Sequence, residues 1–288
     1  MNHVVITGSS TGIGRAAAQE LAGRGYHVFG SVRREADAIE LQAQWGQNFT
    51  PLLFDVTDET AIKAAADRVA ERLAGQGLFG LVNNAGIGGG GPLMHQPLAE
   101  VRRMFEINVL GALAVTQAFL PLLGARRPQP QPPGRIVNVS SVGGKITPPF
   151  LGAYSGSKHA LEAMSNALRR ELSIYGIDVI VIEPGSVKTA IWDKAEQESF
   201  ANKYADTAYG SIATSFEKVF ISQGRAGVGP EVVAGVIRRA LESPHPKTRY
   251  ALPDDPIQGW LLPRLLPDRW LDRLIASRLG LQPNDHSK

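Results

Sequence analysis

The chain has 288 residues, of which 43% are hydrophobic and 20% are charged, a composition typical of an ordinary globular protein. Its formal net charge is only +3 and no dense run of Lys and Arg occurs, so the sequence gives no indication of nucleic-acid binding. It has no cysteine, which excludes disulfides and thiol nucleophiles, and its six histidines show no metal-ligand spacing, so we expect no metal site.

From the N-terminus to about residue 190, short apolar runs alternate with stretches of helical period. Strands are expected at residues 4–7, 28–32, 52–54, 81–83, 135–139 and 178–182, and helices at 14–22, 60–73, 98–123 and 153–174. Repeated β-α units of this length predict a parallel sheet covered by helices on both faces. Right-handed crossovers then give a doubly wound Rossmann domain, with ligands at the carboxyl ends of the strands.

The remaining third of the chain is less regular. Prolines between residues 126 and 134 end the preceding helix and predict a surface connection. A polar stretch dotted with aromatic residues covers 191–224, followed by a helix at 230–241 and a seventh strand at 249–252. We therefore expect one α/β domain over 1–252 with about seven strands, and an amphipathic extension over 253–288.

A glycine-rich turn follows the first strand. The segment Thr7-Gly8-Ser9-Ser10-Thr11-Gly12-Ile13-Gly14 lies between that strand and a helix. Glycines there permit a tight turn and let the backbone approach a pyrophosphate at the positive helix end. Its place after a strand and before a helix indicates a dinucleotide site rather than a simple turn.

The end of the second strand distinguishes between the two nicotinamide cofactors. NAD enzymes place a carboxylate there to bind the ribose hydroxyls, whereas this strand closes with Ser31-Val32-Arg33-Arg34. A guanidinium matches a 2′-phosphate through charge-assisted hydrogen bonds, so Arg33 favours NADP(H) over NAD(H). The alternative is that both arginines only solubilise a loop.

Tyr154 and Lys158 are four residues apart on a predicted helix and so share one face. A free tyrosine is a poor acid or base at neutral pH, and a neighbouring cation is expected to lower its pKa. The pair on its own arises often by chance. The Tyr154–Lys158 pair becomes significant only together with the other motifs of the chain.

Taken together, these motifs resemble the short-chain dehydrogenase/reductase family over roughly residues 1–252. The resemblance rests on an ordered set: Thr7-Gly8-x-x-x-Gly12-Ile13-Gly14, Asp55-Val56, Asn83-Asn84-Ala85-Gly86, Asn108, Ser140-Ser141, Tyr154-x-x-x-Lys158 and Pro184-Gly185-x-Val187-x-Thr189. Two further runs, Leu168-Arg169-Arg170-Glu171-Leu172 and Ile182-Glu183-Pro184-Gly185, are similar to the branch of hydroxysteroid and retinol dehydrogenases.

The resemblance implies a cofactor site. The residues expected to bind NADP(H) are Gly8, Ser10, Gly12, Ile13, Gly14, Arg33, Asp55, Val56, Asn83, Ala85, Gly86, Tyr154, Lys158, Pro184, Gly185, Val187 and Thr189. Asp55 would contact the adenine amino group, and the segment from Pro184 to Thr189 would hold the nicotinamide.

The resemblance also implies a catalytic set. Tyr154 would exchange a proton with the substrate oxygen, Ser141 would hydrogen-bond that oxygen, and Lys158 would lower the tyrosine pKa and bind the nicotinamide ribose. Asn108 would hold a water that relays protons to Lys158. Family spacing of about thirteen residues selects Ser141, while strand alternation gives Ser140 a structural hydrogen bond on the other face.

We therefore expect an oxidoreductase that transfers a hydride between NADP(H) and a carbonyl or secondary alcohol. The aromatic residues in the predicted substrate loop at 190–225 fit a lipophilic substrate, although ordinary packing explains them equally well. One alternative is a 3-oxoacyl-carrier-protein reductase, against which the hydrophobic C-terminal extension argues. Another is an NADP-binding redox sensor without turnover, against which the complete catalytic set argues.

Location and partners follow less directly. The N-terminus shows no signal-peptide pattern and no apolar run spans a bilayer, so we expect a cytoplasmic protein. The extension at 253–288 could lie on a membrane surface or cover the substrate entrance, but packing onto its own domain or a dimer mate is the simpler interpretation. The family resemblance implies a homodimer or homotetramer.

Overall fold

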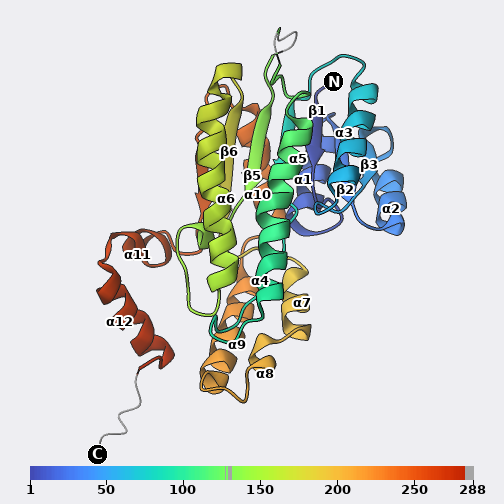
Figure 1. Ribbon diagram of the computed structural model, residues 1–288. Helices are drawn as coiled ribbons and strands as arrows, with labels where there is room; N and C mark the ends of the chain where they lie inside the picture. Colours follow the sequence, from blue (N-terminus) through green and yellow to red (C-terminus); the bar gives the residue numbers. More distant parts are fainter. Residues whose placement is uncertain (127, 129–131, 283–288) are drawn as a thin grey trace, which may run out of the picture.

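The computed structural model describes residues 1–126, 128 and 132–282, and the remainder of the proline-rich connection therefore lies outside the described residues. Seven strands form one parallel sheet in the order β3-β2-β1-β4-β5-β6-β7, which confirms the predicted fold (Figure 1). The strands are β1 (His3–Ile6), β2 (His27–Val32), β3 (Phe49–Leu53), β4 (Gly80–Asn83), β5 (Arg135–Val139), β6 (Asp178–Pro184) and β7 (Arg249–Leu252).

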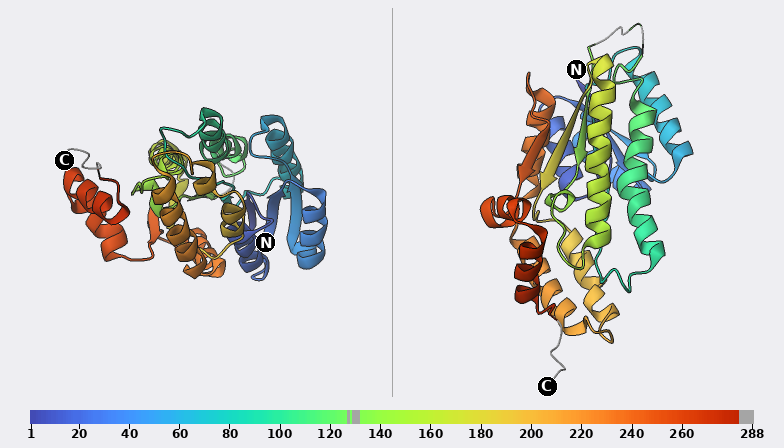
Figure 2. Two further views of the ribbon diagram at one scale, coloured as in Figure 1. Left: turned by 90° about the horizontal axis from the view of Figure 1, so that it is seen from below. Right: turned by 60° about the vertical axis from the view of Figure 1, so that its left-hand side comes forward.

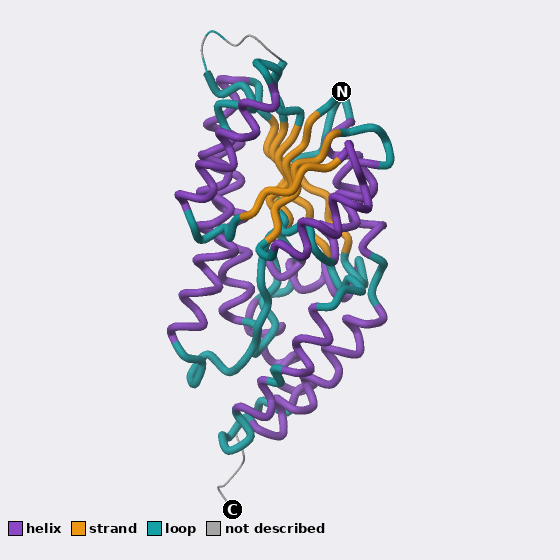
Figure 3. Tube along the Cα trace, turned by 90° about the vertical axis from the view of Figure 1, so that its right-hand side faces the viewer, coloured by secondary structure: helices purple, strands orange, loops and turns teal. Residues whose placement is uncertain are grey.

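Helices cover both faces of the sheet, as Figure 3 shows by the strands enclosed between helical segments. One core lies beneath α1 (Gly12–Ala22), α2 (Glu35–Trp45) and α10 (Pro230–Glu242). The other lies beneath α3 (Glu59–Leu73), α5 (Ala112–Phe119) and α6 (Gly152–Glu171). Along β1, Val4 and Ile6 face the first core and Val5 the second, since successive strand residues point to opposite faces.

The topological switch point lies at β1, which is paired with β2 on one side and β4 on the other. Ile6 is aligned with Gly30 of β2 and with Val82 of β4. The segments that follow these three strands therefore meet at one edge of the sheet, where open α/β folds bind their ligands.

The long helix predicted at 98–123 is found over residues 98–119, with a π turn in its middle. It consists of α4 (Leu98–Phe105), a π turn at Glu106–Gly111 and α5, which ends at Phe119. The wider turn carries Asn108, whose side chain bonds the backbone of Ile87. The contact between Asn108 and Ile87 thus accompanies a local departure from the regular helical period. The sequence pattern does not reveal this departure.

Two further differences concern helices that the sequence pattern did not predict. Helix α2 buries only Ala38 and Leu41, so its apolar stripe is too narrow to stand out. The stretch at 191–224 contains three helices: α7 (Ile191–Gln197), α8 (Phe200–Lys203) and α9 (Gly210–Ala226). In Figure 1 these lie together beyond the carboxyl ends of the strands, so they form a lobe next to the predicted site.

The segment after β7 stands away from the sheet, as Figure 1 and the left view of Figure 2 show. It contains a π turn (Ile257–Leu261), α11 (Leu262–Leu265) and α12 (Asp268–Leu279), and none of these buries a residue. The expected packing of this extension onto its own domain is therefore not seen. Among the described residues, no helix combines the length and apolar character needed to cross a membrane. The domain division at residue 252 stays a prediction.

Candidate active site

The glycine-rich turn after β1 has the tight conformation that the sequence predicts. Gly8 and Gly12 have φ values of +69° and +56°, a region that favours glycine. A Cβ added at Gly14 would lie 2.2 Å from the carbonyl oxygen of Gly8, so no side chain fits there. Helix α1 has no acidic residue in its first turn, which leaves its positive end available to a phosphate.

The other two predicted residues of this turn differ in their surroundings. Ser10 is partly exposed in the turn itself, whereas the partly buried Ile13 packs against the core beneath α1. The side chain of Ile13 therefore packs toward the core, and the backbone of this residue forms part of the turn.

Side chains outside the predicted set hold this turn in place. Asn84 donates through Nδ2 to the carbonyl oxygens of Thr7 (2.9 Å) and Gly8 (3.2 Å). The Oγ of Ser31 accepts a hydrogen bond of 3.0 Å from the Gly8 amide. Sequence reasoning missed both supporting residues, although a serine within the otherwise apolar β2 is a detectable signal.

At the end of β2 the two arginines have different environments. Arg34 is engaged by Asp37, with an NH2–Oδ1 distance of 2.5 Å. Arg33 keeps 70% of its side chain exposed and lies 3.8 Å from the Asp55 carboxylate. Asp55 in turn accepts hydrogen bonds from Thr57 and lines a surface hollow with Arg102, Arg103, Glu106 and Ile107. Both guanidinium groups are exposed, and Arg34 has the closer carboxylate partner, so the assignment of Arg33 to a phosphate stays a prediction.

The segment after β4 divides into a buried and an accessible part. Asn83 is buried and its Nδ2 donates to Thr116 and Asn138, so its side chain supports the sheet rather than facing a ligand. Ala85 and Gly86 are more accessible, and a Cβ at Gly86 would lie 3.1 Å from Asn108 Oδ1 and 3.7 Å from Lys158 Nζ. Val56, the neighbour of Asp55, is buried against Gly111 of the π turn.

The predicted catalytic residues converge where β5 meets α6. The Oγ of Ser141 accepts a 3.0 Å hydrogen bond from the Gly143 amide, which fixes the 3₁₀ turn at Val142–Gly144. A Cβ at Gly143 would meet both Ser141 Oγ (3.3 Å) and Tyr154 Cε1 (3.2 Å), so the two side chains lie on either side of this glycine. Lys158 Nζ is 5.9 Å from the centre of the Tyr154 ring.

The adjacent Ser140 points elsewhere. Its backbone amide bonds the carbonyl oxygen of Ile182, which continues the sheet. Its buried Oγ has no hydrogen-bond partner among the described residues, so the structural side-chain bond that we predicted is not found. Gly144 lies against this hydroxyl and against Glu162.

The pKa of Tyr154 differs from the expectation. Burial raises this pKa above its ordinary value, and a hydrogen bond with Ser141 opposes the rise. The predicted lowering of this pKa by Lys158 is not found: its Nζ is 5.9 Å from the ring centre and donates to the Val139 carbonyl oxygen at 3.0 Å. Burial also lowers the pKa of Lys158 to about 8, while the nearby charge of Glu162 acts to raise it.

Asn108 is fully engaged in the structure. Its Oδ1 accepts from the Ile87 amide (2.8 Å), and its Nδ2 donates to the Ile87 carbonyl (2.9 Å) and to Ser157 Oγ (3.0 Å). Ser157 is the residue before Lys158, so Asn108 connects the loop after β4 to α6. The contacts of this side chain are to protein groups, and its predicted role in holding a water stays a prediction.

The segment from Pro184 to Thr189 closes the opposite side of the site. Asp254 accepts hydrogen bonds from the amide (2.8 Å) and hydroxyl (2.7 Å) of Ser186, and a Cβ at Gly185 would contact the same carboxylate. Val187 forms an isolated parallel bridge with Val228. Thr189 lies against Gly12 of the phosphate turn, so the two ends of the predicted cofactor site meet here.

An aromatic cluster includes Phe150, close in the chain to Tyr154. Phe150 lies four residues before Tyr154 and has a left-handed φ of +65°, which is strained for a phenylalanine. Its ring is 5.3 Å from Phe216 and 6.0 Å from Tyr209, both in or beside α9. Its carbonyl oxygen accepts a 2.7 Å hydrogen bond from Gly91. Aromatic rings therefore pack around Phe150, just before the N-terminus of α6, the helix that carries Tyr154.

Comparison with known proteins agrees with this geometry. The family described as short chain dehydrogenase matches residues 2–199. The chain belongs to this family. Within the part of the chain that the structure describes, no group of three His, Asp or Glu side chains is placed to hold a metal ion.

Individual relatives cover almost the whole chain. An NADPH-dependent 3-dehydrocapnine reductase of Ornithobacterium rhinotracheale is 40% identical over 97% of this chain and 98% of its own. Retinol dehydrogenase 5 of Mus musculus is 33% identical over 95% and 87%. The crystal structure of a short-chain dehydrogenase from Streptomyces avermitilis has a TM-score of 0.77 at 28% identity and covers 97% of both chains. The similarity to retinol dehydrogenases agrees with the branch inferred from the motifs.

Proposed function

We propose that this protein transfers a hydride between NADP(H) and the carbonyl or secondary alcohol of a lipophilic small molecule. The observation that carries the proposal is the convergence of Ser141, Tyr154 and Lys158 beside an aromatic cluster that begins at Phe150. The relative that is an NADPH-dependent reductase supports the same cofactor and the reductive direction.

The residues present fit a dinucleotide phosphate. The turn from Gly8 to Gly14 would hold the pyrophosphate, because its backbone leaves no room for side chains and opens the end of α1. Arg33 would bind the 2′-phosphate, and Asp55 and Val56 would border the adenine. The backbone of Asn83, Ala85 and Gly86 and the segment with Pro184, Gly185, Val187 and Thr189 would border the remainder, including the nicotinamide.

When bound, NADPH supplies the hydride. Tyr154 is the general acid of the reduction: its high pKa keeps the phenol protonated at neutral pH, ready to give that proton to the carbonyl oxygen. Ser141 would donate a hydrogen bond to the same oxygen and stabilise its developing charge, because the Gly143 amide donates to its Oγ and does not use the hydroxyl proton. Lys158 supplies a positive charge near the reacting groups. Asn108 links α6 to the loop after β4 and so keeps Lys158 close to Gly86.

A substrate panel tests the proposal. NADPH oxidation would be measured with steroid ketones, retinal, aromatic ketones and acetoacetyl thioesters. We expect turnover with the lipophilic carbonyls and little with the thioesters. Turnover confined to the thioesters would instead indicate a 3-oxoacyl-carrier-protein reductase. Tight NADPH binding with no turnover on any member would indicate a redox sensor.

We further infer a peripheral contact between the C-terminal tail (residues 257–279) and an anionic membrane surface. The tail exposes Ile257, Leu261, Leu262, Leu265, Trp270 and Leu274. It carries four arginines (264, 269, 273, 278) against two aspartates (268, 272), so its charge complements an anionic lipid headgroup.

Vesicle sedimentation tests this contact. The full chain should bind phosphatidylglycerol vesicles and not phosphatidylcholine vesicles, and a Leu265→Glu/Trp270→Glu variant should lose that binding. No binding to either vesicle, with a tail-dependent dimer in solution, would overturn it in favour of a second copy. By family resemblance we also propose a homodimer or homotetramer, which light scattering with the intact chain would test. The cytoplasmic location stays a prediction from the sequence.

A further inference from the structure

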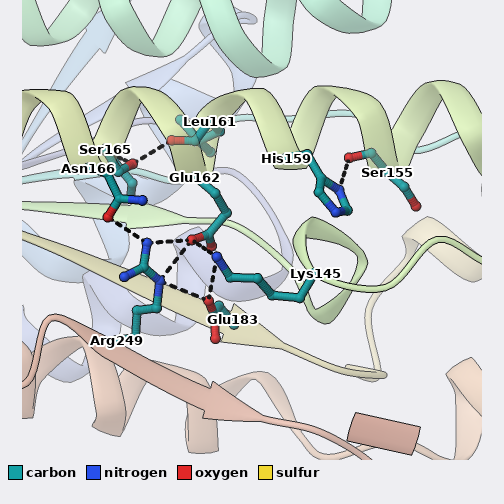
Figure 4. Close-up of polar contacts among 10 residues, drawn as sticks. Lys145, Ser155, His159, Leu161, Glu162, Ser165, Asn166, Glu183 and Arg249 are labelled. Atoms are coloured by element: carbon teal, nitrogen blue, oxygen red, sulfur yellow. Dashed lines mark hydrogen bonds and ion pairs between the residues drawn. The ribbon is translucent and has the colours of Figure 1, made fainter. Parts of the chain in front are cut away.

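Four charged side chains, two of them buried carboxylates, form a cluster between α6, β6 and β7 (Figure 4). It contains Lys145, Glu162, Glu183 and Arg249. The Glu162 and Glu183 side chains are only 4% and 1% exposed. Burying two carboxylates is costly unless cations and hydrogen bonds compensate, so the cluster needs a reason for its position.

The cluster joins the elements that carry Ser141, Lys158 and the segment from Pro184 to Thr189. Glu162 follows Lys158 by one turn of α6, and Lys145 follows the turn that Ser141 begins. Glu183 directly precedes Pro184 at the end of β6, and Arg249 begins β7, which is paired with β6. Movement of one of these elements would therefore disturb the others through the cluster.

The two carboxylates have unequal contacts. Glu162 Oε2 lies 2.9 Å from Lys145 Nζ and 2.9 Å from Arg249 Nε. Glu183 Oε1 lies 3.3 Å from the same Nε and 4.0 Å from the same Nζ, so it receives weaker compensation. Arg249 also donates to Asn166 Oδ1 at 2.9 Å, which fixes its guanidinium.

The pKa values follow these contacts. Burial and the neighbouring charge of Glu162 raise the pKa of Glu183 to about 7. Burial acts to raise the pKa of Glu162 as well, but Lys145 and Arg249 together lower it below its ordinary value. Glu162 is thus the permanent carboxylate of the pair, and Glu183 is the one that gains a proton near neutral pH.

Glu162 also faces the catalytic lysine. Residues four apart share a helix face, and both side chains are buried, so little solvent screens their interaction. The negative charge of Glu162 opposes the effect of burial on Lys158. His159, the neighbouring titratable residue on α6, hydrogen-bonds the Ser155 carbonyl oxygen instead, as Figure 4 shows.

We propose that Glu162 is a positioning residue for Lys158: its buried carboxylate keeps the lysine charged and fixes the turn after Ser141 through Lys145, while Glu183 adjusts the local charge. The inference rests on the proposed function in that Lys158 acts as the catalytic lysine. Glu162, Lys145 and Glu183 would thus contribute to the reaction without contacting the substrate or the cofactor.

The pH profile of kcat tests this role with Glu162→Gln, which removes the charge and keeps the shape. Lys158 should then lose its proton more easily, so the alkaline fall of kcat should move to lower pH by about half a unit or more. Glu183→Gln, the milder change for folding, should move it in the same direction by less. A double variant, Lys145→Gln/Glu162→Gln, removes one charge of each sign. The pH of its alkaline fall in kcat should therefore lie closer to that of the unmodified protein than the pH found for Glu162→Gln alone.

A purely structural role predicts a different pattern. Each variant would then lower kcat at every pH without moving the alkaline fall, and the double variant would be worse than either single change. That pattern would overturn the proposal.

A second measurement separates this test from a failure of the proposed reaction. The chemical shift of the Lys158 side-chain carbon can be followed by NMR in the full chain labelled with ¹³C-lysine, and Lys158→Arg identifies its signal. The Lys158 titration should move to lower pH in Glu162→Gln whether or not any substrate turns over. An unchanged titration in a folded variant would refute the role of Glu162, while absent turnover with a shifted titration would refute only the proposed reaction.

Discussion

The ammonium group of Lys158 donates a 3.0 Å hydrogen bond to the carbonyl oxygen of Val139. This contact joins α6 to the end of β5, two residues before Ser141, and so holds the serine and the lysine at a fixed separation. Because the site is buried, the bond lies where water does not compete for either partner.

Tyr154→Phe should remove the proton donor and leave the cofactor site intact. Because general acid catalysis contributes about 10²- to 10⁴-fold, we expect kcat for NADPH oxidation to fall by at least about a hundredfold. The Kd for NADPH, measured by fluorescence titration, should change by less than about threefold, equivalent to about 0.6 kcal/mol. Near-normal turnover would refute the role of Tyr154.

The activity should depend on pH through Lys158. Its pKa of about 8 means that its positive charge is lost as the pH rises through that value, so kcat/KM should decline above pH 8. The effect on stability has the opposite sign: between pH 8 and the unfolded value of 10.5 the unfolded chain binds more protons, so this group favours folding increasingly as pH rises. In Lys158→Met, the remaining activity should lack the decline above pH 8.

Arg33→Ala should weaken NADPH binding and leave NADH binding nearly unchanged. A charge-assisted hydrogen bond contributes about 1.5–3 kcal/mol, so the Kd for NADPH should rise by about 10- to 150-fold. Arg34→Ala is the matched control, since Arg34 is engaged by Asp37 and its loss should have little effect. Equal effects of the two substitutions would contradict the assignment of Arg33 to the 2′-phosphate.

Gly14→Ala should abolish NADPH binding, because the added Cβ would lie 2.2 Å from the Gly8 carbonyl oxygen and 2.4 Å from Asn84 Nδ2. Gly235 of α10 is the matched helical glycine, with no atom within 4 Å of an added Cβ. Gly235→Ala should instead stabilise the fold by up to about 1 kcal/mol. Calorimetry and NADPH titration of both variants would separate the loss of a site from a general helix effect.

The sequence predicted the sheet and the ordered motifs because both depend on local patterns. Apolar runs define β1 to β7, and glycines with forced backbone angles mark the phosphate turn. The features that the sequence did not predict depend on contacts between residues far apart in the chain. Asn84 supports the turn only because β4 lies beside β1, and the rise in the pKa of Tyr154 comes from packing around its ring rather than from its spacing to Lys158.

The substrate lobe shows the same limit. Trp192 and Phe216 were visible as aromatic residues, but the helices of this lobe are held by distant segments, among them Phe150 and the loop at Gly90 and Gly91. A polar stretch with scattered rings has no clear period, so its helices could not be assigned from the chain alone. The role of the rings in substrate choice stays a prediction.

The π turn at Glu106–Gly111 has a consequence for engineering this protein. A π turn amounts to one residue inserted into an α-helix, and one residue corresponds to a rotation of about 100°. Removing a single residue there would turn α5 about its axis and move Val115 and Phe119 out of the core, while Asn108 would leave Gly86. Chain length at this helix is thus as constrained as residue identity, and a redesign that shortens or lengthens it should fail even when every motif is retained.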